Sequence, residues 1–443
     1  MFNTSPRHVY HRKVVEASER PHPDTVMRIA VTPKATCALA GGSFTLSSDD
    51  PRSANDYSDY PPGNQAAWTR STLFVRLKHR WNVGHNYLAG ITAGDWIRLL
   101  RANRFAVDPV YWHRAAFITL SSLMNSVSRR KEERLFKAAV AKAQVAPPLF
   151  VIGHWRTGTT HLHNLLAQDS DQFAFANTYQ VVNPHTFLCT EEVNTRRFAW
   201  LVPPKRPMDN MALSFQSPQE DEFAPCLMSL RSLYLGISFA RREDYYTRYL
   251  TFRGVPAGEV EEWKGAFVWF LKKLSFKHGR RLVLKSPPHT ARIRLLLELF
   301  PEARFVHIHR NPYTVFQSFR HYFDTAMWLT YLQRPDLTGI DDRILQRYNL
   351  LYDAFFEERS LIPSGHFHEV SFEELERNPV EEMQKLYENL NLSGFHSFRP
   401  KLQGYVESLS GYRKNEFGEL DSSLRVKIAR AWQRSFDEWH YPL

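Results

Sequence analysis

The chain has 443 residues, of which 43% are hydrophobic and 23% are charged, a balance typical of a globular protein with at least one large core. Its formal net charge of +11 favours an anionic partner, such as a nucleotide, a nucleic acid or a lipid surface. Three widely spaced cysteines argue against a disulfide framework or a zinc site, and no run reaches the roughly 18–20 apolar residues that span a bilayer, so we expect a soluble cytoplasmic protein.

Two segments precede the predicted core domain. Residues 1–70 are rich in Ser, Asp, Gly and Pro and show no sustained period, which predicts an irregular arm. The sequence leaves open whether translation starts at Met1 or Met27. From Thr72 to Lys142 apolar residues recur at three- and four-residue steps, so we predict a helical accessory segment over residues 71–145. The residues that set this period are Trp96, Leu99, Leu100, Phe117, Leu120 and Met124.

A domain with a different pattern is predicted over residues 146–443. Short apolar runs are typical of strands that are buried on both faces of a parallel sheet. Three such runs are Leu149–Ile152, Leu282–Leu284 and Phe305–Ile308, and a further strand candidate is Phe367–Val370. Amphipathic helices are predicted over Thr290–Phe300 and Pro379–Leu390. Because strand, helix and strand follow one another closely, we predict an α/β domain with a central, mainly parallel sheet.

An anion-binding loop is predicted directly after the first strand. The loop reads Gly153-His154-Trp155-Arg156-Thr157-Gly158-Thr159-Thr160 and leads into a helix. A strand, a tight loop and a helix N-terminus gather backbone N–H groups and the helix dipole around one point. The spacing matches the phosphate loop G-x-x-x-x-G-K-[ST], except that Thr159 stands where the lysine belongs. A kinase or NTPase needs that lysine and a metal-binding aspartate, whereas the neighbouring strands run into Lys285 and Arg310.

This loop resembles the 5′-phosphosulfate loop of sulfotransferases that use 3′-phosphoadenosine-5′-phosphosulfate (PAPS), which reads [KR]-[ST]-G-T-[TS]. The resemblance implies that Arg156, Thr157, Gly158, Thr159 and Thr160 bind the donor, and that no metal is needed. It also implies a P-loop-type three-layer sandwich, here with an N-terminal helical extension. The resemblance is nearest to bacterial members with an Arg-Thr-Gly-Thr-Thr loop and extends to the tyrosylprotein enzymes.

A second donor-binding segment is predicted after Phe305–Ile308. Arg310 ends the strand, Asn311 is a suitable N-cap, and Pro312 is a suitable first helical residue. Asn311 and Ser318 are two helical turns apart and share a face, so Arg310 and Ser318 can converge on one phosphate at the carboxyl edge of the sheet. This segment resembles the family's 3′-phosphate site.

A third basic element is the pair Arg413 and Lys414. It resembles the family's late loop that closes over the 3′-phosphate, although Asn415 stands where many members have glycine. The alternative is a charged surface turn.

Sulfuryl transfer requires in-line geometry, charge stabilisation and an activated nucleophile. Lys285 closes a buried strand and matches the Lys-Ser-Pro lysine of the family, so we predict that it stabilises the leaving oxygen. Arg156 is predicted to stabilise the sulfuryl oxygens.

The general base has two candidates. Related enzymes often place a glutamate where this chain has Gln180, which cannot accept a proton. Glu222 is the first candidate, because partial burial would raise its pKa into a useful range. His154 in the loop is the second. Glu220 forms the pattern of a capping box with Ser217, which predicts a structural role.

The sequence therefore predicts a sulfotransferase that moves a sulfuryl group from PAPS to a hydroxyl or amine by metal-independent in-line displacement, leaving adenosine 3′,5′-bisphosphate. The alternatives are a P-loop nucleotide kinase or NTPase, and a basic nucleic-acid-binding protein without catalysis. The acceptor stays open among small molecules, carbohydrates, lipids and peptides. No nucleic-acid partner is expected, and the oligomeric state is not predicted.

Overall fold

Five parallel strands form a single sheet in the order β2-β3-β1-β4-β5. The computed structural model describes residues 77–202, 205–206 and 208–443, which all belong to one compact unit. The arm predicted over residues 1–70 lies outside the described residues. The strands are β1 (Leu149–Ile152), β2 (Phe173–Phe175), β3 (Arg281–Lys285), β4 (Arg304–His309) and β5 (Phe367–Ser371).

Helices make up most of the remaining structure. They are α1 (Ala93–Ala102), α2 (Trp112–Lys142), α3 (Thr159–Leu166), α4 (Thr178–Val182), α5 (Phe187–Arg197), α6 (Phe223–Ser229), α7 (Leu235–Ser238), α8 (Glu243–Thr247), α9 (Ala257–His278), α10 (Ile293–Leu299), α11 (Pro312–Thr325), α12 (Ile340–Glu358), α13 (Phe372–Arg377), α14 (Pro379–Asn389), α15 (Phe395–Ser408), α16 (Ser422–Ala431) and α17 (Gln433–Glu438). Among the described helices, none is long and apolar enough to cross a membrane.

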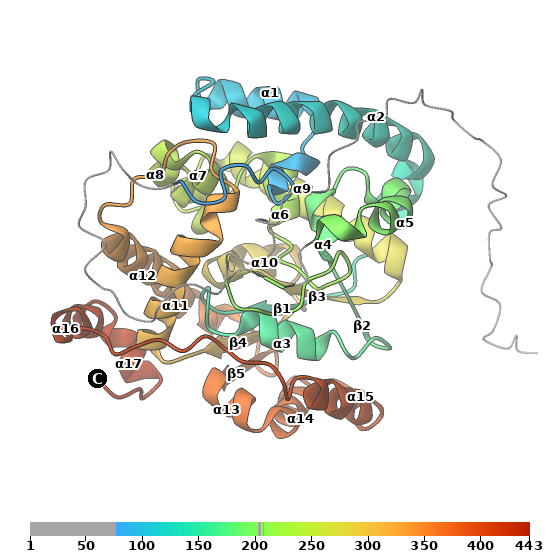
Figure 1. Ribbon diagram of the computed structural model, residues 1–443. Coiled ribbons are helices and arrows are strands. Elements are labelled where there is room, and N and C mark those ends of the chain that lie inside the picture. Colours follow the sequence, from blue (N-terminus) through green and yellow to red (C-terminus); the bar gives the residue numbers. More distant parts are fainter. Residues whose placement is uncertain (1–76, 203–204, 207) are drawn as a thin grey trace, which may run out of the picture. The chain divides into compact units, whose positions relative to one another are not determined.

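Helices cover both faces of the sheet, which gives three layers (Figure 1). Side chains alternate between the two faces along each strand. On one face Val151 and Val283 pack in a cluster with α3, α13 and α14. On the other face Phe150 and Phe305 pack in a cluster with α9, α10 and α12. The predicted three-layer α/β fold with a central parallel sheet is confirmed.

The four strands predicted from apolar runs are present, and β2 is an addition at the edge of the sheet. The helix predicted over Pro379–Leu390 corresponds to α14. The helix predicted over Thr290–Phe300 is wrong in its first turn, because a 3-10 helix over Pro287–Ala291 precedes the shorter α10. The two prolines at the start of this segment remove backbone donors, so the chain leaves β3 through a tight turn instead of a full α-helix.

The long helix α2 packs against α1, α5 and α9 at the upper edge of the view in Figure 1. The period predicted for this region is that of a helix, but two of the residues that set it do not enter the core. Leu120 and Met124 are each 61% exposed, whereas the buried face of α2 carries Ile118, Ser122 and Val140. This reversal gives α2 an apolar face toward solvent.

Candidate functional site

The loop between the central strand β1 and helix α3 is tightly constrained. Gly153 and Gly158 have φ angles of +148° and +101°, a region that disfavours residues with a Cβ. A Cβ on Gly158 would also collide with the ring of Phe372. The Thr157 hydroxyl donates to the carbonyl of His154 at 2.8 Å and closes the loop. The loop therefore directs the first N–H groups of α3, which begins at Thr159, toward one space.

Arg156 links this loop to helix α11. Its Nε donates to the Ser318 hydroxyl at 2.9 Å, so the two predicted donor-binding segments meet in the structure. Its Nη1 lies 3.0 Å from the Asp209 carboxylate, which Arg206 also contacts at 3.3 Å. Burial alone would raise the pKa of Asp209, but Arg206 and Arg156 hold it below the ordinary value. Sequence reasoning did not identify Asp209 or Arg206 as residues of the site.

Arg310 lies on the same side of the loop. Its Nη1 donates to the Arg156 carbonyl at 3.4 Å, and its guanidinium stacks on Phe372 with 4.0 Å to the ring centroid. Its Nε is buried and makes no hydrogen bond within the described part of the chain. A buried donor without a partner is costly, so this nitrogen is suited to bind an anionic oxygen of a ligand.

These residues line a cleft with a volume of about 710 Å³. Its walls include Arg156, Gly158, Thr159, Thr160, Arg310, Ser318, Phe372, Tyr405, Tyr412 and Lys414. The cleft combines cationic side chains, helix N–H groups and aromatic rings, and it is large enough for a nucleotide. The loop glycines, the unpaired Arg310 Nε and the cleft volume together fit an anionic ligand of nucleotide size.

Of the two basic residues predicted in the late loop, Arg413 and Lys414, only one lines the cleft. Lys414 lines the cleft and forms an ion pair with Glu376 at 2.6 Å. Asn415 also lines it and donates to the Met208 carbonyl at 3.0 Å. Arg413 is exposed and does not line the cleft, so the structure does not bring it to the other predicted donor ligands.

Lys285 ends β3 next to the loop, because its Cα is paired with Val151 of β1 in the sheet. Its Nζ lies 3.0 Å from the Glu220 carboxylate, whose second oxygen accepts a short hydrogen bond from the Tyr234 hydroxyl. The hydroxyl of Tyr234 in turn accepts from the indole N–H of Trp155 at 3.2 Å. Burial lowers the pKa of Lys285, and Glu220 opposes the shift. Burial also raises the pKa of Tyr234 well above its ordinary value, which keeps its hydroxyl protonated.

Arg206 connects this cluster to the cleft. Its Nη1 donates to the Thr160 hydroxyl at 3.4 Å, and its charge acts together with burial to lower the pKa of Lys285. Asp209 thus joins Arg156 to Arg206, and the charge of Arg206 acts on the separate pair of Lys285 and Glu220. The predicted capping box of Ser217 with Glu220 is wrong, because α6 begins only at Phe223 and Glu220 turns toward Lys285 instead.

The family of the chain is decided by its sequence. The family model described as the sulfotransferase family matches residues 147–397, more than half of the chain. The chain belongs to the sulfotransferase family. The sulfotransferase is 37% identical over 353 residues to omega-hydroxy-beta-dihydromenaquinone-9 sulfotransferase Stf3 of Mycobacterium bovis and of Mycobacterium tuberculosis. Each match covers 80% of this chain and 90% of the relative.

Solved structures with the same fold include two mycobacterial enzymes. Sulfotransferase STF9 from Mycobacterium avium matches with a TM-score of 0.55 at 17% identity, covering 80% of this sulfotransferase and 98% of STF9. Sulfotransferase STF1 from M. tuberculosis H37Rv matches with a TM-score of 0.53 at 14% identity, covering 80% and 94%. At these identities the likeness concerns the fold alone.

Glu222, the first predicted base, is placed in the core of the sulfotransferase. Its two carboxylate oxygens lie 2.7 and 3.1 Å from the guanidinium of Arg292, and the Ser232 hydroxyl donates to it at 2.7 Å. Both charged side chains are fully buried. The Glu222 carboxylate is held by a bidentate arginine and enclosed on every side, so it cannot reach a substrate proton. Its position favours a structural role.

His154, the second predicted base, is also enclosed. Its Nδ1 donates to the Trp155 carbonyl at 2.8 Å, and its ring packs against Phe319 and Tyr348. Burial lowers the pKa of His154 to about 3, so the imidazole is neutral and weakly basic at neutral pH. This placement favours a structural role in the loop.

The pair of Glu222 and Arg292 gives the first testable expectation. Replacing Arg292 by methionine leaves a buried carboxylate unpaired and should lower the free energy of unfolding by about 3–5 kcal/mol, as measured by urea denaturation. The matched control is Arg196→Met, which removes a fully exposed pair with Glu192 and should cost less than about 1 kcal/mol. An Arg292→Met enzyme of normal stability but without turnover would instead place this pair in the reaction.

Proposed function

We propose that this sulfotransferase transfers the sulfuryl group of PAPS to a hydroxyl acceptor and releases adenosine 3′,5′-bisphosphate. The observation that carries the proposal is the meeting of the two donor-binding segments in one cleft, where Arg156 of the loop contacts Ser318 of α11 at 2.9 Å. A nucleotide with a phosphosulfate at one end and a phosphate at the other needs two anion sites that are fixed relative to each other. The loop and Arg310 supply such sites.

The proposed roles of the donor ligands follow from their positions. The loop from Arg156 to Thr160 would bind the 5′-phosphosulfate through backbone N–H groups, hydroxyls and the guanidinium. Arg310 and Ser318 would bind the 3′-phosphate, with Lys414 at the outer wall of the cleft. Arg413, which is exposed, would contribute only through long-range charge.

The transfer step would depend on Lys285 and Glu220. The ammonium of Lys285 would stabilise the negative charge that develops on the leaving oxygen of the donor. Glu220 is the carboxylate of this cluster, and we propose it as the general base that accepts the proton of the acceptor hydroxyl. Tyr234 holds the second oxygen of Glu220 and fixes the orientation of the carboxylate. The S–O bond to the acceptor forms as the S–O bond to the phosphate breaks, and no metal is required by these roles.

For the acceptor we propose the hydroxyl of a lipid-like molecule. The Stf3 relatives are named for a hydroxylated menaquinone, and they match 80% of this chain. The aromatic residue Tyr234 contacts the proposed base, and Phe223 packs against Tyr234 with 4.9 Å between ring centroids. We also infer a cytoplasmic location, because Cys189 and Cys226 are free thiols, as is usual for cysteines in a reducing compartment.

A thermal shift series tests the donor. Adenosine 3′,5′-bisphosphate should raise the melting temperature without magnesium, whereas 5′-AMP should raise it little. At a ligand concentration 100 times Kd the stabilisation is about 2.7 kcal/mol. The Arg310→Ala variant should lose this shift, because the cationic partner of the 3′-phosphate is removed.

The matched control is Arg377→Ala, an exposed arginine at the end of α13 that does not line the cleft. Its response to the bisphosphate should equal that of the wild type. A shift with Mg-ATP and none with the bisphosphate would overturn the proposed donor and favour the kinase alternative.

A further inference from the structure

The outward face of α2 changes character half-way along the helix. Its first half presents Trp112, Leu120, Leu123, Met124 and Val127, each more than half exposed. Its second half presents the exposed side chains of Arg130, Lys131, Arg134, Lys137 and Lys142. At 100° per residue these ten side chains fall within an arc of about 140°, opposite the buried side chains of Ile118 and Glu132. We call these ten residues the outer face of α2.

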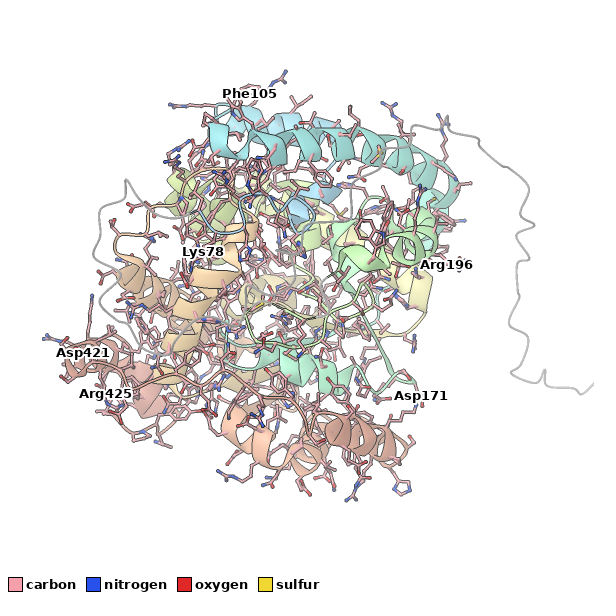
Figure 2. All side chains as sticks on the ribbon, in the orientation of Figure 1. Lys78, Phe105, Asp171, Arg196, Asp421 and Arg425 are labelled. Atoms are coloured by element: carbon pink, nitrogen blue, oxygen red, sulfur yellow. The ribbon has the colours of Figure 1, made fainter. Side chains whose placement is uncertain are left out.

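The apolar half of the outer face is unusual for a helix in water. Single exposed apolar residues are common on proteins, but five on one face over four turns form a contiguous patch. The patch extends toward the end of α1, where Ile97 and Phe105 are also exposed. Figure 2 labels Phe105 at the outer edge of the layer formed by α1 and α2. The core of the protein does not use this surface, because Ile118 and Val140 on the opposite side of α2 supply the packing.

The exposed charges on α1 and α2 are mostly positive. Between Ala93 and Lys142 the exposed basic side chains are Arg98, Arg101, Arg104, Arg130, Lys131, Arg134, Lys137 and Lys142, which makes eight. Over the same range the one exposed acidic side chain is Glu133, and it is paired with Arg129 at 2.7 Å. A surface that joins an apolar patch to such an excess of positive charge fits a partner that is apolar inside and anionic outside.

We propose that the outer face of α2 binds the surface of an anionic lipid bilayer. The basic half contacts the headgroups, and the apolar half enters the boundary between headgroups and acyl chains. Trp112 is suited to this boundary, since its exposed ring is apolar and its indole N–H is already satisfied by the Val107 carbonyl at 3.1 Å. The helix lies on the bilayer and does not span it, in agreement with the absence of a spanning helix among the described residues.

Charge complementarity favours a bilayer over a second copy of the chain. If two copies met symmetrically across the outer face, each basic half would face either the partner's basic half or its apolar half. The first arrangement sets like charges against each other, and the second removes charges from water without a counter-ion. An anionic bilayer matches both halves at once. Binding to a bilayer would also bring the enzyme close to a lipid acceptor. This benefit rests on the proposed function, whereas the bilayer binding itself does not.

Vesicle flotation tests the proposal with the full-length protein. Vesicles of phosphatidylcholine with phosphatidylglycerol should bind the protein, and vesicles of phosphatidylcholine alone should bind it more weakly. Arg130→Ser with Lys131→Ser should weaken binding to the mixed vesicles about 25-fold, since each basic residue near an anionic surface contributes about fivefold. Leu123→Gln with Met124→Gln should weaken binding to both vesicle types by at least about tenfold.

The matched control is Arg399→Ser with Lys401→Ser on α15, which removes the same charge at the lower edge of the view in Figure 1, opposite α1 and α2. This variant should bind like the wild type, and an equal loss would mean that only net charge matters, which overturns the proposal. Light scattering provides a second check, because it measures the molecular mass in solution. If the wild type is a dimer and the variant with Leu123→Gln and Met124→Gln is a monomer, this face is an interface between copies and the bilayer proposal is wrong. A lower melting temperature of that variant would mean that the chain itself covers the face.

The donor site serves as an independent reference. All these variants should keep the thermal shift with adenosine 3′,5′-bisphosphate, because the outer face is separate from the residues that line the cleft. If vesicle binding fails while this shift persists, the bilayer proposal falls and the proposed donor stands. If the bisphosphate gives no thermal shift while the protein still binds vesicles, the proposed donor falls and the bilayer proposal stands.

Discussion

Replacing Glu220 by glutamine is expected to lower kcat about a hundred- to ten-thousandfold, the usual contribution of a positioned general base. Glutamine preserves the size of the side chain, and its amide oxygen can still accept a hydrogen bond from Lys285 while its NH2 group donates to the Tyr234 hydroxyl, but it cannot accept a proton. Single-turnover assays with a labelled sulfuryl donor would measure the transfer rate. The thermal shift with adenosine 3′,5′-bisphosphate should be unchanged, because Glu220 does not line the donor cleft.

The control for this variant is Glu376→Gln, a carboxylate that does line the cleft and is paired with Lys414. It should alter donor affinity slightly and leave kcat near the wild-type value. Equal rates for Glu220→Gln and the wild type would remove Glu220 from the reaction. Since Glu222 and His154 are enclosed in the core, the base would then have to come from the acceptor side.

Replacing Lys285 by methionine is the second change with a large expected effect. The variant removes the ammonium that we propose stabilises the leaving oxygen, and the loss of one such group typically lowers kcat about a hundred- to a thousandfold. The Glu220 carboxylate also loses its partner at 3.0 Å, so the protein should become less stable. Donor binding, measured by thermal shift, should persist because the loop and Arg310 are intact. A Lys285→Met enzyme with normal kcat would show that the leaving oxygen is stabilised elsewhere.

The pH profile gives an independent test of Lys285. Because burial lowers its pKa, this lysine should lose its proton at a pH below the ordinary value of about 10.4. The ammonium is the active form, so kcat should fall as the pH rises through the lowered pKa. Lys285→Arg keeps the charge at all accessible pH values and should remove this alkaline limb, even if the transfer rate is reduced.

Most strands of the sheet were predictable because each has a recognisable pattern in its own short stretch of sequence. β1, β3 and β4 are buried on both faces, so each appears as a short, mostly apolar run, interrupted only by His307 in β4. β2 consists of only Phe173, Ala174 and Phe175 at the sheet edge, and three residues are too few to show a pattern. In α2 the helical period was visible, but a period cannot tell which face is turned inward.

The donor-binding residues were predictable for a different reason. Arg156 lies in the loop after β1 and Arg310 directly follows the neighbouring β4, so the topology of a parallel sheet brings them to one edge. Glu220 has no such marker. It lies in a loop 65 residues before Lys285, and only the folded chain shows that the two meet. Its spacing from Ser217 matches that of a capping box, so the sequence predicts a structural role for Glu220 and leaves Glu222 as the candidate base.

Arg156 carries its own counter-ion, because the Asp209 carboxylate lies 3.0 Å from its guanidinium. A donor that binds through this guanidinium therefore exchanges one anion for another and does not simply add charge to the cleft. In such an exchange the number of neutralised cations changes little, so dissolved salt has little net attraction left to screen. Donor affinity in this enzyme should depend on ionic strength less steeply than its net charge of +11 suggests.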